Sequence, residues 1–267
     1  MTQAAAGTGL PRLLVRDAGK RYGDLLALSG CSFAVGRNEI VALVGSSGCG
    51  KTTLLWSMSG LHPLTSGEVL LEGNRVTGPR PEIGLVFQEA NLLPWRTLER
   101  NIHFPFEIKG AAPERAWIAH LLDRVGLKGF EDRMPRELSG GMQQRGALVR
   151  ALALRPSVLL MDEPFGALDA FTREDMNRLL EEIWMEAPTT IVFVTHSIEE
   201  AALLADRVVV LSRRPGRVLA DHAVPFARPR GPEVMASREA FELMNRIKAD
   251  IYSQQPPRAA VSHAAAE

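Results

Sequence analysis

A glycine-rich stretch that ends in a lysine and two threonines is the part of this sequence best suited to chemistry. It occupies residues 45–53, between an apolar run at 39–44 that is typical of a buried parallel strand and a helical pattern at 54–58. Glycines let successive backbone N–H groups turn inward around a phosphate, and the helix directs its partly positive N-terminus at the same anion. Lys51 can reach the β- and γ-phosphates and Thr52 can bind Mg²⁺, so the stretch predicts a nucleoside triphosphate site. This phosphate loop consists of Gly45, Ser46, Ser47, Gly48, Cys49, Gly50, Lys51, Thr52 and Thr53.

Two adjacent carboxylates, Asp162 and Glu163, follow a second apolar run at 158–161, which is typical of a central parallel strand. Successive strand residues face opposite sides, so the two carboxylates can have different tasks. One can reach the Mg²⁺ that Thr52 would bind, and the other can face an attacking water. A solvated acidic turn is the alternative interpretation.

Polar side chains stand at the ends of two further expected strands. Gln88 follows the strand expected at 82–87, and His196 follows the β-branched run 189–195. The carboxyl ends of parallel strands are where open α/β sheets bind ligands. A strand-end histidine on its own is more often structural than catalytic.

An aromatic residue and a helix start complete the features that could contact a nucleotide. Tyr22, upstream of the phosphate loop, offers a flat ring on which a purine can stack, or is a half-buried structural tyrosine. Ser139 is expected to cap a helix that runs to about residue 154. Gly140 and Gly141 leave its first N–H groups uncovered, as an anion site requires.

The elements that must position these residues form a strand-rich chain with a helical interruption. Strands are expected at 13–16, 31–35, 67–73, 82–87, 158–161, 189–195, 207–211 and 217–220, the last two as edge strands of the core. A turn at Gly23 and Asp24 joins the first two strands. The pattern is helical from 97 to about 129, and an amphipathic helix is expected at 235–252. Its apolar face would carry Phe241, Met244, Ile247, Lys248 and Ile251.

The composition is that of one large α/β domain or one core with an inserted subdomain. The chain has 267 residues, of which 46% are hydrophobic and 23% charged, and 31 basic side chains balance 31 acidic ones. This balance gives no field that favours nucleic acid. No run reaches the ~18 apolar residues of a membrane span, and no secretory signal is present at the start, so we expect a cytoplasmic protein. The two cysteines, Cys31 and Cys49, make no disulfide framework.

The order of these motifs resembles the ATP-binding subunit of ABC transporters over residues 13–221. An aromatic, the phosphate loop, Gln88, the sequence LSGG at 138–141, the Asp-Glu pair, the sequence ALD at 167–169 and His196 follow one another as in that family. The resemblance implies an α/β fold, with a RecA-like P-loop NTPase core, an antiparallel β subdomain and an inserted helical signature subdomain. We place the ATPase domain at 12–253, with the helical subdomain at about 89–155. The amphipathic pattern puts a C-terminal helix at about 235–253, and the composition of the two ends predicts disorder at 1–11 and 254–267.

The resemblance also assigns roles. Tyr22 would stack on adenine, Thr52 and Asp162 would hold Mg²⁺, and Gln88 would sense Mg²⁺ and the γ-phosphate. Glu163 would be the general base for the hydrolytic water, which His196 would orient while binding the γ-phosphate. Ser139, Gly140 and Gly141 would act on the ATP of a second copy, so the subunit would work as a head-to-tail homodimer with two ATP molecules between the protomers. Asp169 would connect the two sites.

A narrower likeness points to the nitrate, sulfonate and taurine importer branch. The segments that carry it are 87–95, 161–170, 211–217 and 225–230. Such importers pair two of these subunits with two permease subunits and a periplasmic solute-binding protein, at the cytoplasmic face of the plasma membrane. The loop 92–95 would then face the permease, although packing of Trp95 in the core is the alternative.

Other ATPases of this class fit less well. A soluble assembly ATPase, as in iron–sulfur cluster biogenesis, is similar in length but usually has S-G-L-D where this chain has Gly166-Ala167-Leu168-Asp169. A DNA-repair ATPase would need a long heptad insertion, which this chain lacks. The transported solute stays open, since the motor does not contact it; nitrate, sulfonates, taurine and thiamine-precursor pyrimidines are all compatible.

Two residues depart from or add to the family pattern. Ser197 stands where Asp commonly follows the histidine, and with Glu200 it has the spacing of a capping box, so the helix start is expected to persist. Cys49 lies near a helix N-terminus, which lowers a thiol pKa. We therefore expect thiol reagents to inactivate the protein and MgATP to protect it.

Overall fold

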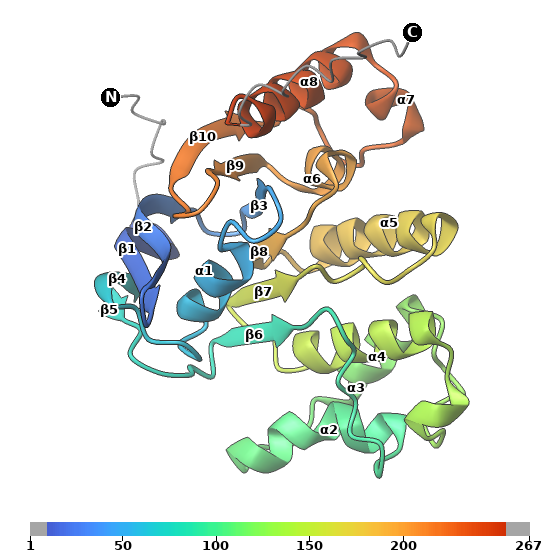
Figure 1. Ribbon diagram of the computed structural model, residues 1–267. Coiled ribbons are helices and arrows are strands. Elements are labelled where there is room, and N and C mark those ends of the chain that lie inside the picture. The colour runs from blue at the N-terminus through green and yellow to red at the C-terminus, as the bar shows by residue number, and fades with distance from the viewer. Residues whose placement is uncertain (1–9, 255–267) are drawn as a thin grey trace, which may run out of the picture.

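The central element of the computed structural model, which describes residues 10–254, is a mostly parallel sheet (Figure 1). Within these residues its strand order is β10-β9-β3-β8-β7-β6. The strands are β3 (Ile40–Gly45), β6 (Ile83–Val86), β7 (Val158–Asp162), β8 (Thr190–Val194), β9 (Arg207–Leu211) and β10 (Val218–Ala223). Only β10 runs antiparallel to its neighbour, β9. The carboxyl ends of β3, β7 and β8 therefore meet at one edge, because parallel strands end on the same side.

A second, antiparallel sheet lies beside the first. It has the order β2-β1-β4-β5, with β1 (Leu13–Tyr22), β2 (Leu25–Val35), β4 (Ser66–Leu71) and β5 (Asn74–Arg75). The expected turn at Gly23 and Asp24 is confirmed, since β1 and β2 pair as a hairpin around it. Helix α1 (Lys51–Met58) lies between the two sheets and contacts both (Figure 1).

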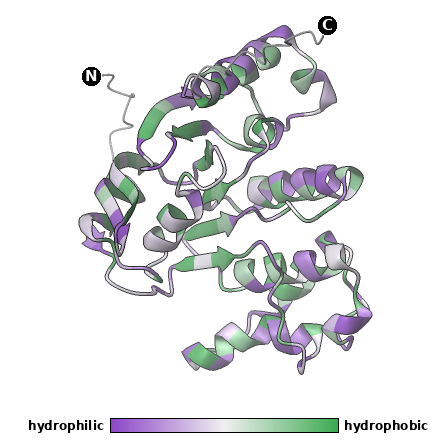
Figure 2. Ribbon diagram, viewed as in Figure 1, coloured by the Kyte–Doolittle hydropathy of each residue, from purple (hydrophilic) through white to green (hydrophobic). Residues whose placement is uncertain are grey.

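The inner strands of the central sheet, β3, β7, β8 and β9, are buried on both faces, which explains their mostly apolar sequences. In β3, Ile40, Ala42 and Val44 belong to a core shared with the helices on one face. Val41 and Leu43 belong to a second core, shared with α1 and the antiparallel sheet. Figure 2 shows the same pattern, with mostly hydrophobic arrows flanked by helices of mixed hydropathy.

Helices fill the segment between β6 and β7. They are α2 (Leu98–Lys109), α3 (Arg115–Arg124), the 3₁₀ helix η1 (Pro135–Glu137) and α4 (Gly140–Leu152). The helical pattern expected at 97–129 is thus two helices, because α2 ends at Gly110, whose φ of +62° suits a glycine. Three further helices, α5 (Ala170–Glu186), α6 (Ile198–Leu204) and α8 (Arg238–Tyr252), supply side chains to the first core.

Two expectations about the last third of the chain are wrong. The strand at 207–211 is not an edge strand, since β9 lies between β3 and β10. The helix expected from 235 begins at Arg238, because Ser237 caps α8 and a separate turn, α7 (Pro232–Met235), precedes it. The buried face of α8 carries Ala240, Leu243 and Ile247, and Phe241 is exposed.

The ends of the chain lie mostly beyond the described part. Of the disordered segments expected at 1–11 and 254–267, only positions 10, 11 and 254 are described. Among residues 10–254, no helix is both long and apolar enough to cross a bilayer.

Candidate nucleotide site

The phosphate loop joins the carboxyl end of β3 to the start of α1, as its sequence predicts. Gly50, the residue before the helix, has a φ of +103°, a value that residues with a Cβ rarely adopt. A Cβ at this position would also lie 2.7 Å from Cδ2 of Leu28 in β2. The loop can therefore fold against the hairpin only with glycine at Gly50, and this leaves the first N–H groups of α1 without side-chain cover.

Lys51 is folded against its own loop. Its residue is only 7% exposed, and its Nζ donates to the carbonyl oxygens of Gly45, at 2.9 Å, and Ser46, at 3.1 Å. These bonds hold the ammonium group at the mouth of the loop instead of in bulk solvent. Because the Lys51 side chain is already ordered, it loses little further conformational entropy when a phosphate binds.

A hydrogen bond joins the phosphate loop to the carboxylate pair. The hydroxyl of Thr52 donates to Oδ1 of Asp162 at 2.9 Å, although 110 residues separate them. Burial raises the pKa of the Asp162 carboxyl, and the bond from Thr52 partly opposes this. A hydroxyl and a carboxylate oxygen are ligands that Mg²⁺ prefers, so the pair fits this ion. No group of three or more His, Cys, Asp or Glu suited to a metal occurs within residues 10–254, so Mg²⁺ would need further oxygens from a phosphate.

Glu163 and His196 come together at the same edge of the sheet. Oε2 of Glu163 lies 3.4 Å from Nδ1 of His196, whose side chain is 60% exposed. Glu163 has a φ of +44° and donates its N–H to the carbonyl of Val194 in β8. A non-glycine residue with this backbone geometry is strained by about 1–3 kcal/mol, and such strain clusters at functional sites.

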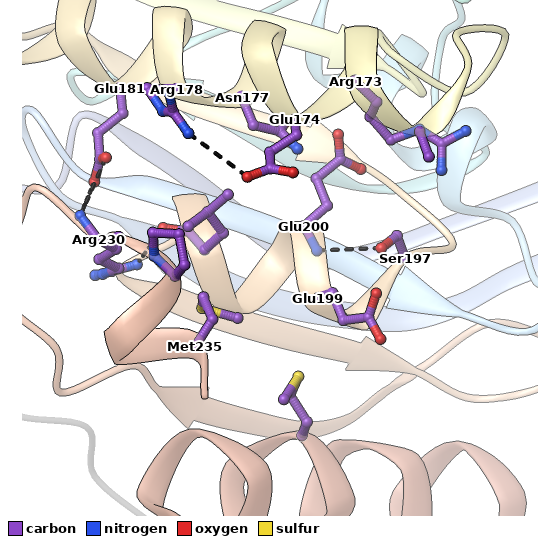
Figure 3. A pocket seen from close by; sticks show the side chains of 15 residues that line it. Arg173, Glu174, Asn177, Arg178, Glu181, Ser197, Glu199, Glu200, Arg230 and Met235 are labelled. Atoms are coloured by element: carbon purple, nitrogen blue, oxygen red, sulfur yellow. Dashed lines mark hydrogen bonds and ion pairs between the residues drawn. The ribbon is translucent and has the colours of Figure 1, made fainter. Parts of the chain in front are cut away.

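The residues on either side of His196 are tied to each other. The hydroxyl of Ser197 accepts from the N–H of Glu200 at 3.1 Å, so the expected cap of α6 is confirmed. The expectation of a full capping box is wrong, because the Glu200 carboxylate does not accept from the N–H of Ser197. That N–H donates to the Thr195 hydroxyl at 3.0 Å, and the hydroxyl in turn donates to the Glu200 carboxylate. Figure 3 shows the Glu200 side chain pointing from α6 toward α5, into the side of a separate cavity of about 500 Å³.

A cavity of about 320 Å³ opens over the phosphate loop. Its walls are Tyr22, Leu25, Ala27, Ser47, Gly48, Gly50, Lys51, Thr52, Thr53, Glu163 and Arg214. Tyr22, 41% exposed, stands at the end of β1 with its hydroxyl 3.1 Å from Nδ1 of His62. Sequence reasoning placed Tyr22, the loop and Glu163 here but missed Leu25, Ala27 and Arg214, because no local pattern marks a residue that only the folded chain brings to the loop.

The remaining expected site residues do not line this cavity. Gln88 follows β6 and is exposed. Ser139 caps α4 by accepting from the N–H of Met142 at 3.3 Å. Asp169 caps α5 by accepting from the N–H of Thr172, at 3.1 Å, and from its hydroxyl, and these bonds lower the pKa of the Asp169 carboxyl.

The two glycines of the LSGG sequence, Gly140 and Gly141, lie at the start of α4 and do not line the phosphate-loop cavity; Gly141 faces the start of α5. Gly140 is exposed, and a Cβ on Gly141 would lie 3.2 Å from Cγ2 of Thr172. One chain thus presents two separate surfaces: the phosphate-loop cavity, and a surface formed by Ser139, Gly140, Gly141 and Asp169.

The expectation that the helix N-terminus lowers the pKa of the Cys49 thiol is wrong. Cys49 is 1% exposed, and burial raises the pKa of its thiol more than the nearby Lys51 lowers it. Burial outweighs the effect of the helix N-terminus on this pKa, because Cys49 belongs to the core that α1 shares with the antiparallel sheet.

Comparisons with known proteins agree with this geometry. A family model described as ABC transporter matches residues 28–166. A taurine import ATP-binding protein, TauB of Burkholderia thailandensis, is 47% identical over 86% of each chain. An uncharacterized ABC transporter ATP-binding protein of Methanocaldococcus jannaschii is 50% identical over 76% of this chain and 77% of that one. A solved dimeric ATP-binding cassette in a post-hydrolysis state, bound to ADP and Pi, has a TM-score of 0.70 and 30% identity, and covers 80% of this chain and 100% of its own.

The fold and the site define an α/β P-loop NTPase, since a glycine-rich loop leads from a parallel strand into a helix beside a carboxylate two strands away. The chain belongs to the ABC transporter family, as an ATP-binding subunit with ATPase activity.

Proposed function

We propose that this chain is the motor subunit of an importer for a small sulfonate such as taurine. The observation that carries the proposal is the 47% identity to a taurine import ATP-binding protein over 86% of both chains. Similar proteins from Roseobacter denitrificans and Jannaschia sp., 47% and 45% identical, have the same description. The iron–sulfur assembly alternative has no such support.

In this proposal the phosphate-loop cavity holds ATP. Tyr22 stacks on the adenine ring, while the N–H groups of residues 45–53 and the ammonium of Lys51 hold the phosphates. Thr52 and Asp162 would hold Mg²⁺, and Gln88, which follows β6, would sense this ion and the γ-phosphate. When bound, Mg²⁺ neutralises charge on the β- and γ-phosphates.

Glu163 is the general base of the proposed reaction. Its carboxylate lines the cavity and lies next to His196, so a water between these side chains and the γ-phosphate would have an acceptor for its proton. His196 binds the γ-phosphate and orients this water. Phosphoryl transfer needs such positioning more than covalent chemistry.

A second copy completes the site. Ser139, Gly140 and Gly141 lie outside the cavity of their own chain. Ser139 caps α4 at Met142, and Gly140 and Gly141 carry no side chain that would keep a phosphate from the first N–H groups of the helix. A head-to-tail homodimer would place them over the ATP of the partner, with Asp169 near the junction. Similar solved cassettes are described as dimeric.

The loop 92–95 is the proposed contact with the permease. Trp95 is 70% exposed, which argues against the alternative of core packing. The buried side chain of Asn101 holds the loop by bonds to Leu93 N and to the carbonyls of Leu93, Arg96 and Thr97. A rigid loop with an exposed tryptophan suits a partner helix. Two permease subunits would place the motor at the cytoplasmic face of the membrane, served by a periplasmic solute-binding protein, with no nucleic acid involved.

The test is transport by the reconstituted complex. The full chain would be co-purified with a permease of this branch and placed in proteoliposomes with MgATP and a solute-binding protein. We expect taurine to raise ATPase activity and to accumulate, and a Glu163→Gln complex to do neither. Stimulation by nitrate and not by sulfonates would refute the assignment of the solute. ATPase activity that is independent of both the permease and the solute would refute the importer function.

A further inference from the structure

A cation from a distant part of the chain lines the phosphate-loop cavity. Arg214, in the connection between β9 and β10, is one of its walls. Its Nε donates to the carbonyl of Gly48 at 3.2 Å, and a Cβ on Gly48 would lie 3.1 Å from Arg214 Nη2. The guanidinium therefore lies directly against the phosphate loop.

The connection that carries Arg214 is held in place by its own backbone. Gly216 donates its N–H to Ala27 at 2.8 Å and accepts from the N–H of Ser29 at 2.9 Å, which attaches the connection to β2. A Cβ on Gly216 would lie 2.3 Å from the carbonyl oxygen of Cys49, so only glycine permits this approach to the loop. Arg214 thus extends from a fixed backbone.

The charge of Arg214 is available to a ligand. No carboxylate within residues 10–254 lies within salt-bridge distance of its guanidinium, whereas Arg207, in the preceding strand, pairs with Glu39 and Asp221. The charged walls of the cavity are Lys51, Arg214 and Glu163, two cations against one carboxylate. An exposed guanidinium offers several N–H donors in a planar fork that matches phosphate oxygens.

We propose that Arg214 is a nucleotide-binding residue whose guanidinium contacts the phosphate chain of ATP, in addition to Lys51. Contact with the phosphates is favoured over contact with the base, because Arg214 lies against Gly48 of the phosphate loop. The proposal rests on the cavity being the ATP site, but not on the importer function or its solute.

The test measures nucleotide affinity of the isolated full-length chain, without a permease. Arg214→Gln removes the charge, Arg214→Lys keeps it without the fork, and Arg213→Gln is the matched control, since its exposed side chain is not a wall of the cavity. Losing one charge-assisted contact should weaken MgATP and MgGTP binding about tenfold, and to equal extents. Arg214→Lys should recover part of the affinity, Arg213→Gln should match the wild type, and the deficit should shrink at high salt.

Three results would overturn the proposal. Unchanged affinity in Arg214→Gln would show that the guanidinium stays in solvent. A loss confined to ATP, with GTP unaffected, would show contact with the base. An equal loss in Arg213→Gln would show a general charge effect. A failed transport assay would leave this measurement intact, so the two proposals are tested separately.

Discussion

The buried carboxylate of Glu200 accepts a hydrogen bond from the hydroxyl of Thr195. This bond spans His196, which lies between β8 and α6. Ser197 joins the same ring through its N–H and its hydroxyl. The residues before and after His196 are thus bonded to one another, next to the imidazole that faces Glu163.

Replacing Thr195 by valine should separate hydrolysis from binding. The variant keeps the side-chain shape but leaves the Ser197 N–H and the Glu200 carboxylate unpaired, a loss of about 1–3 kcal/mol of stability. We expect kcat to fall about tenfold with ATP affinity unchanged, because the geometry of His196 is relaxed. Thr189→Val is the control: its hydroxyl also makes a bond, to Pro156, but at the other end of the same strand segment. Equal kcat in both variants would contradict the role of the ring.

The stability contributed by Glu200 should depend on pH. Burial raises the pKa of its carboxyl in the folded protein, with Thr195, Arg173 and His196 opposing the rise and Glu163 adding to it. The folded state therefore binds the proton more tightly, and stability is lost as pH rises from the unfolded pKa through the folded pKa. The loss is about 1.4 kcal/mol for each pH unit that separates these two pKa values. The free energy of unfolding, measured with denaturant, should therefore depend on pH differently in the wild type and in Glu200→Gln. On acidification the wild type should gain stability relative to the variant. A stability difference between the wild type and Glu200→Gln that stays constant with pH would refute the raised pKa.

Replacing Glu163 by glutamine should trap the ATP-bound state. The amide keeps the size of the side chain but cannot accept the proton of water, so hydrolysis should fall about 100-fold or more. ATP binding should persist, and a stable dimer should appear with ATP in size-exclusion chromatography. Glu174→Gln, on the surface of α5, should behave as wild type. Wild-type turnover in the Glu163 variant would remove it as the base.

Trp95 should matter for the permease and not for the nucleotide. Because its side chain is largely exposed, Trp95→Ala should change the free energy of unfolding by less than about 0.5 kcal/mol. Capture of the permease should weaken at least about tenfold if Trp95 is an anchor of that interface. Phe241→Ala, which removes an exposed aromatic on α8, is the control. Unchanged capture by the Trp95 variant would exclude the loop as the contact.

Thiol reagents should act slowly on the folded chain. Cys49 is buried with a raised pKa, and burial raises the pKa of Cys31 to about 11, so little thiolate is present near neutral pH. Modification with an aromatic disulfide should be slow in buffer and fast in denaturant, with ATPase activity retained meanwhile. Rapid inactivation, prevented by MgATP, would restore the expectation drawn from the sequence.

Much of this protein was predictable from local patterns. The phosphate loop between strand and helix, the hairpin turn at Gly23 and Asp24, and the Ser139 cap all depend on residues within a few positions of each other. Backbone sterics, helix caps and strand periodicity act over that range, so the residue types alone specify the element.

The tertiary structure decided the features that depend on what lies beside an element. Thr52 meets Asp162 because β3, which leads into α1, lies two places from β7 in the central sheet. Arg214 reaches Gly48 because its connection docks on β2. Cys49 has a raised pKa because the antiparallel sheet covers it, and β9 is internal because β10 folds back along it. The sequence by itself determined a phosphate loop with its carboxylates. Burial and contacts between distant segments decided which side chains share its cavity, because solvation and electrostatics depend on the packed neighbours and not on the order of residues.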